Sequence, residues 1–247
     1  MLALLLAAIN LRPGITSLAP LIERIAAELA LSRWLVSLTT ALPVLCMGLL
    51  ALLAPRCAVR FGLERTITGC LGLIGLALLL RLGSQAGGLL IGSAVLMGSG
   101  IAVAGPLLSA FIKRHFVDHI GRVVGWYSFG MAIGGAAGAV LTLPLTRALG
   151  DNWSFGLAGW ALPALIAAAL WACLPNLKEI PAENDGQGLP WREPRAWLVT
   201  GFFAIQAGMF YTLATWLVAR YHEAGFSMLY SNGLFGTFML VGLPSAW

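Results

Sequence analysis

Apolar residues in this chain form long runs separated by short polar segments. Each run holds close to the ~20 apolar residues that an α-helix needs to cross the hydrocarbon core of a bilayer. The pattern predicts seven full spanning helices and an eighth that reaches the C-terminus, near residues 1–20, 33–55, 66–84, 88–112, 123–146, 155–174, 196–218 and 228–247. We therefore expect an all-α, polytopic membrane protein.

The polar segment 175–195 is the longest interruption of this pattern. It is rich in proline, glycine and charged residues, which is typical of a linker between helical bundles. It divides the chain into an N-terminal six-helix bundle over residues 1–174 and the first two helices of a second bundle over residues 196–247, the last of them incomplete.

Composition and charge agree with a membrane protein and indicate its orientation. Hydrophobic residues make up 59% of the chain and charged residues only 10%, against about 25% charged in soluble domains. If alternate loops lie on opposite sides, nine lysines and arginines fall on one side, which includes Arg60 and the linker, and four on the other. The positive-inside rule then predicts a cytoplasmic N-terminus in the inner membrane. The net charge of +5 is spread over short loops, so we expect no nucleic-acid partner.

A charged, broken stretch lies inside the first predicted helix, N-L-R-P-G-I-T-S at residues 10–17. Arg12 in mid-span costs roughly 2.5 to 3.5 kcal/mol on insertion scales, so it needs an interior partner or an aqueous cavity. Pro13 removes a backbone donor and Gly14 loosens the same turn. These features favour a binding site for an anion or a dipolar solute. The alternative is an arginine that snorkels to the interface or holds helix ends together.

Helical spacing suggests which neighbours could share that site. Arg12 and Thr16 are four residues apart on one face, and Asn10 lies on an adjacent face. Gln206 and Tyr211 in the seventh helix offer hydrogen-bonding groups from the second bundle. Each of these side chains could instead make a hydrogen bond between helices.

Small residues predict two further features of the helices. Gly130, Gly134 and Gly138 form overlapping G-x-x-x-G steps in the fifth helix, which favours close contact with a neighbouring backbone. Gly105 and Pro106 interrupt the fourth helix, and paired broken helices are a sequence sign of a transporter site.

The remaining ionisable residues do not indicate catalysis. Arg81 lies near the outer end of the third helix, where we expect its side chain to snorkel. All ten acidic residues and the three histidines fall in predicted loops or at helix ends, so none is expected to be a buried proton relay. No metal-binding or catalytic signature is present. We therefore expect no cofactor, no metal and no enzyme activity.

Several segments resemble a known transporter family. The opening N-L-R-P-G-I-T-S, together with R-F-G-L-E-R (60–65), I-K-R-H-F (112–116), G-W-Y-S (125–128) and W-L-V-A-R-Y-H-E-A-G-F-S (216–227), is similar to the cyanate and 2-nitroimidazole porter family of the major facilitator superfamily. The resemblance covers the whole chain in order. It implies a carrier of two six-helix halves that moves a small anionic or polar organic solute by alternating access.

The resemblance also adds candidate residues. Tyr127, within G-W-Y-S, joins Arg12, Asn10, Thr16, Gln206 and Tyr211 as a candidate substrate-binding residue. The loop with Arg60, Gly62 and Arg65 would be the cytoplasmic gating loop, in a degenerate form of the superfamily's motif in which Val59 replaces the acid.

The chain ends at Trp247, inside the predicted eighth helix. Twelve-helix relatives would extend four and a half helices further, so we expect a fragment or a truncated gene product. The alternative to a transporter is therefore a non-transporting membrane remnant or an interaction module. The expected partners are a small-molecule solute and the lipid bilayer.

Overall fold

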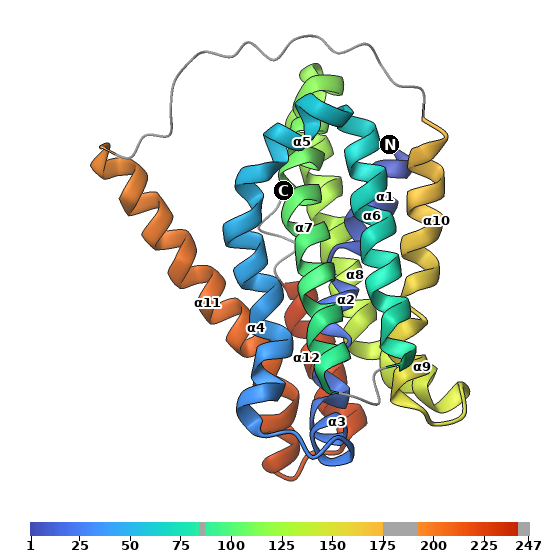
Figure 1. The fold of residues 1–247 in the computed structure, drawn as a ribbon. Helices are drawn as coiled ribbons and strands as arrows, with labels where there is room; N and C mark the ends of the chain where they lie inside the picture. Colours follow the sequence, from blue (N-terminus) through green and yellow to red (C-terminus); the bar gives the residue numbers. More distant parts are fainter. Residues whose placement is uncertain (84–86, 175–191, 242–247) are drawn as a thin grey trace.

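The computed structural model describes residues 1–83, 87–174 and 192–241, and these residues form helices and no strands (Figure 1). The first half contains α1 (Leu2–Asn10), α2 (Pro13–Thr16), η1 (Ala19–Leu21), α3 (Ile22–Glu28), α4 (Arg33–Leu50), η2 (Ala51–Leu53), α5 (Ala54–Phe61), α6 (Leu63–Leu80) and η3 (Arg81–Gly83). The second half contains α7 (Gly87–His115), η4 (Val117–His119), α8 (Ile120–Ala148), α9 (Trp153–Ala158), α10 (Ala161–Ala172), α11 (Pro194–Glu223) and α12 (Met228–Val241).

The number of membrane-spanning segments agrees with the hydropathy pattern. Within the described residues, seven segments are long and apolar enough to cross a membrane, and α12 is a shorter apolar helix. The prediction of a polytopic all-α protein is thereby confirmed. The first segment is longer than predicted, because α1, α2, η1 and α3 continue one another from Leu2 to Glu28.

The predicted linker lies mostly outside the described residues, which omit positions 175–191. At its end, Pro194 and Arg195 already belong to α11. A proline in the first turn of a helix loses no hydrogen bond, since the first amides have no partner within the helix. The sequence-based boundary was therefore two residues late.

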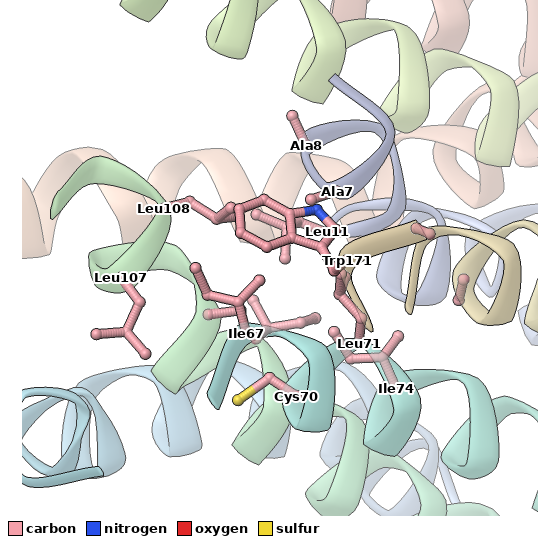
Figure 2. Close-up of a cluster of buried hydrophobic side chains, with 14 of the residues drawn as sticks. Ala7, Ala8, Leu11, Ile67, Cys70, Leu71, Ile74, Leu107, Leu108 and Trp171 are labelled. Atoms are coloured by element: carbon pink, nitrogen blue, oxygen red, sulfur yellow. The ribbon is translucent and has the colours of Figure 1, made fainter. Parts of the chain in front are cut away.

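One buried cluster packs the first bundle together (Figure 2). It joins α1, α6, α7 and α10, with the Trp171 ring between Ala7 of α1, Leu71 of α6 and Leu108 of α7. The Trp171 indole nitrogen donates to the Ala3 carbonyl at 2.8 Å, which leaves its one polar group satisfied. Close packing of this kind, rather than exclusion from water, holds helices together within a bilayer.

The glycines of α8 form a face on which the broken first segment rests. A methyl group at Gly130 would meet Leu5 and Ala8, one at Gly134 would meet the Ile9 carbonyl, and one at Gly138 would meet Pro13 and Thr16. The predicted close contact along the G-x-x-x-G steps is confirmed. Because backbone lies directly against backbone, this face sets the position of α1 and α2.

Candidate solute-binding site

A cavity of about 300 Å³ lies where the first bundle meets α11. Five segments contribute residues to its wall: α2 with the two residues that precede it, α4 with η2, α7, α8, and α11. They supply Leu11, Arg12, Ile15, Thr16, Met47, Ala51, Ile101, Ala102, Gly105, Pro106, Tyr127, Met131, Phe210, Tyr211 and Ala214. The volume is at the small end of the roughly 300 to 1,000 Å³ typical of small-molecule sites.

Arg12 is the one charged residue among the described residues that line this cavity. It directly precedes α2, at the break between α1 and α2, so the predicted interruption of the first helix is confirmed. Its guanidinium carbon lies 4.6 Å from the centre of the Phe210 ring. Among the described residues its guanidinium has no ion pair and no hydrogen bond. The donors of Arg12 therefore remain available for a ligand in the cavity.

Three of the other predicted residues also line the cavity. The Tyr211 hydroxyl makes a long contact of 3.6 Å with the sulfur of Met47. Tyr127 is buried, and within the described residues its hydroxyl makes no hydrogen bond. The Thr16 hydroxyl donates to the Arg12 carbonyl at 3.2 Å, which leaves its oxygen free only as an acceptor. Arg12, Thr16, Tyr127 and Tyr211 are thus brought together, although their roles stay a prediction.

Asn10 and Gln206 lie elsewhere. The Asn10 side-chain amide donates to the carbonyls of Leu6 and Pro163, at 2.7 and 3.2 Å, so it joins α1 to α10. Gln206 is exposed on α11 and is absent from the cavity wall. Neither residue belongs to the site as the structure forms it. Asn10 instead has the interhelical role that the sequence left open.

The helix break predicted at Gly105 and Pro106 is not formed in the structure. Both residues line the cavity, yet α7 runs without a break from Gly87 to His115. A proline within a membrane helix is tolerated where neighbours or a cavity satisfy the freed backbone group. The carbonyl that Pro106 leaves without its usual donor belongs to Ala102, which also lines the cavity.

The predicted gating loop is a tight turn between α5 and α6. Gly62 has φ 87° and ψ 152°, a conformation that is essentially restricted to glycine. Arg60 and Arg65 are exposed on either side of it, and the Arg60 guanidinium lies 5.3 Å from the Phe61 ring centre. The backbone conformation of this turn explains why residue 62 is a glycine, while the gating role of the loop stays a prediction.

Arg81 does not snorkel, contrary to the sequence-based expectation. Its side chain is completely buried. Its Nη1 donates to the Gly14 carbonyl at 3.1 Å, and its Nε lies 3.5 Å from the Ser93 hydroxyl. The break in the first segment leaves the Gly14 carbonyl in need of a donor, and only the folded bundle brings Arg81 to it.

Among the acids that the structure describes, one is buried, although it does lie at a helix end as predicted. Glu64, in the first turn of α6, is 4% exposed. One of its carboxylate oxygens lies 3.9 Å from Nε2 of His115, the last residue of α7. A carboxylate at a helix N-terminus is favoured by the helix dipole. The predicted position at a helix end is therefore confirmed for Glu64, while the absence of a proton relay stays a prediction.

The sequence did not indicate Phe210 as a site residue, although it lines the cavity and contacts Arg12. It directly precedes Tyr211 in α11, and its ring covers the Arg12 guanidinium. The sulfur-containing Met47 and Met131 complete the apolar wall. An apolar residue on a membrane helix has no sequence sign that separates a cavity wall from a lipid-facing surface. Only the rotation of α11 in the packed structure places Phe210 in the cavity wall.

A bundle with a broken, cationic first helix and a cavity against the next bundle is the architecture of a polytopic solute carrier. The Major Facilitator Superfamily model matches residues 4–247, and the chain belongs to this superfamily. It is 33% identical over 237 residues to the cyanate transport protein CynX of Escherichia coli (strain K12), covering 95% of this chain. It is 32% identical over 244 residues to the 2-nitroimidazole transporter of the same organism, covering 96% of this chain.

A solved structure agrees on the fold. The chain matches the crystal structure of a D-xylose–proton symporter with a TM-score of 0.76 at 12% sequence identity, over 98% of this chain and 66% of that one. At this identity the likeness concerns the fold alone. The chain spans 61% of the length of both curated relatives named above. Both of these relatives are transporters by name.

Proposed function

We propose that this chain forms the solute-binding part of a secondary transporter for a small anionic or polar organic solute. The observation that carries the proposal is the guanidinium of Arg12 in the cavity wall, which has no ion pair or hydrogen bond within the described residues. A cation with no carboxylate among its described neighbours favours a ligand that brings negative charge or an electron-rich group. The names of the two relatives, a cyanate transport protein and a 2-nitroimidazole transporter, support the same substrate class.

The wall of the cavity supports a small, partly apolar ligand. Apart from Arg12, its polar side chains are Thr16, Tyr127 and Tyr211, and most of the remaining lining is aliphatic, aromatic or sulfur-containing. A planar guanidinium can donate two parallel hydrogen bonds to an anion or a nitro group. The aromatic and sulfur-containing side chains would contact the apolar part of the solute. Residues 1–174 and 196–247 would be the two domains that move about this site, and the turn at Gly62 would gate its cytoplasmic side.

Binding of the proposed solutes can be measured on the 247-residue chain itself, since described residues form the cavity. We expect purified protein in nanodiscs to bind radiolabelled cyanate, and unlabelled 2-nitroimidazole to compete for the same site. D-xylose, which is neutral, should not compete even in large excess. Absence of cyanate and 2-nitroimidazole binding to folded protein, or equal competition by D-xylose, would contradict the proposed substrate class.

We also propose a cytoplasmic N-terminus, on the basis of the nine-to-four distribution of cations. The N-terminus and α5 lie at one end of the bundle, and α3 and α9 at the other (Figure 1). The turn after α11, which contains the exposed Ala224, would then face outward.

Thiol labelling tests this orientation in a background without the native cysteines Cys46, Cys57, Cys70 and Cys173. A membrane-impermeant maleimide should label Ala224→Cys in intact cells. It should label Arg56→Cys, an exposed position on α5, only after the membrane is permeabilised. The reverse result for the two positions would overturn the proposed topology.

A further inference from the structure

Arg81 is a fully buried cation that does not line the cavity. It belongs to η3, directly after α6. Its donors reach the Gly14 carbonyl at 3.1 Å, the Ser93 hydroxyl at 3.5 Å and the Met97 sulfur at 3.7 Å. Within the described residues it makes no ion pair. All three partners are uncharged, so no carboxylate offsets the burial of this charge.

A buried guanidinium with only uncharged partners cannot be explained by a gain in stability. Taking a guanidinium out of water costs free energy, and a thioether and a long hydroxyl contact recover little of it. An apolar side chain of similar length at position 81 would avoid this cost. A buried charge without a counter-charge lowers stability, and such unfavourable arrangements are expected at functional sites. The shortest contact of Arg81 is its hydrogen bond to the Gly14 carbonyl, and this bond therefore indicates the role of the side chain.

The Gly14 carbonyl is a backbone group that the helix break leaves without its helical donor. In a continuous helix the amide of Leu18 would donate to it, but that amide donates to the Ile15 carbonyl at 3.3 Å instead. Gly14 lies in α2, two residues after Arg12. On α8, Gly138 packs against Pro13 and Thr16 of the same turn. The turn is thus held by packing against α8 and against Met97 of α7, and by one charged hydrogen bond from Arg81.

We propose that Arg81 is a positioning residue that holds α2 in place and thereby directs the Arg12 side chain into the cavity. The bond to Gly14 orients the four-residue α2, and Arg12, which directly precedes α2, lines the cavity together with Ile15 and Thr16 of that turn. The effect on ligand binding rests on the proposed function. The effect on the order of α2 does not.

The test compares Arg81→Met and Arg81→Lys with the parent chain. Methionine removes the donor and the charge, whereas lysine keeps both on a shorter reach. Arg147→Met is the matched control, since Arg147 is an exposed arginine in the last turn of α8. For each purified chain, hydrogen exchange of a peptide covering residues 11–18, the dissociation constant for cyanate and the unfolding temperature are measured.

We expect Arg81→Met to fold, to unfold no more easily than the parent, and to exchange faster only in residues 11–18. Its affinity for cyanate should fall about tenfold, the effect of losing one well-placed hydrogen bond to a charged group. Arg81→Lys should recover part of both effects, and Arg147→Met should match the parent.

Two results would overturn the positioning role. The first is unchanged exchange at residues 11–18 together with unchanged affinity in Arg81→Met. The second is faster exchange throughout the bundle or loss of folded protein, which would assign Arg81 to general stability. If the parent chain does not bind cyanate, that result counts against the proposed function alone, because the exchange measurement still tests whether Arg81 holds α2.

Discussion

We expect Arg12→Ala to weaken cyanate binding by about a hundredfold or more, because two hydrogen bonds to an ionised group are lost at once. Arg12→Lys should retain part of the affinity, since lysine keeps the charge but not the planar pair of donors. The measurement is the dissociation constant of purified, monodisperse protein. This design separates a loss of binding from a loss of folded protein.

The control for this experiment is Arg147→Ala, which removes an exposed cation outside the cavity wall. Its affinity should equal that of the parent, which would exclude a general effect of net charge on anion binding. If Arg12 only holds helices together, Arg12→Ala will reduce the yield of folded protein and leave the affinity of the remainder unchanged. An unchanged dissociation constant in folded Arg12→Ala would remove Arg12 from the site.

The second large effect is expected from a single methyl group on the glycine face of α8. In Gly134→Ala the new carbon would overlap the carbonyl of Ile9, a backbone group that cannot rotate away. The helices must then separate, at a cost of about 1 to 3 kcal/mol or more for overpacking. We expect a marked loss of monodisperse protein in detergent and a lower unfolding temperature.

The same substitution at Gly121 provides a matched control, because it is in the same helix and nothing lies within 4 Å of the added carbon. There alanine should be neutral or should stabilise the helix, by up to about 1 kcal/mol from helix propensity. Equal stability of Gly134→Ala and Gly121→Ala would contradict the close packing of α1 against α8.

The features that were predictable from the sequence are those that each segment determines for itself. A helix in a bilayer satisfies its backbone hydrogen bonds internally, so its position follows from the local run of apolar residues. The seven spanning segments were predictable for this reason. The break at Pro13 and Gly14 was predictable because a missing amide donor and a residue without a Cβ act on their own turn. The contact face of α8 was predictable from the spacing of its glycines alone.

Only the tertiary structure could show which side chains interact with distant segments of the chain. Asn10 faces the Pro163 carbonyl, and Arg81 faces the Gly14 carbonyl, across 153 and 67 residues of sequence. On α11, the rotation of the helix turns Phe210 and Tyr211 into the cavity and leaves Gln206 exposed. Hydropathy cannot decide such a rotation, because a lipid-facing surface and an apolar cavity wall both accept the same residues. The identity of the spanning segments is therefore a local property, whereas the composition of the site depends on how the helices pack.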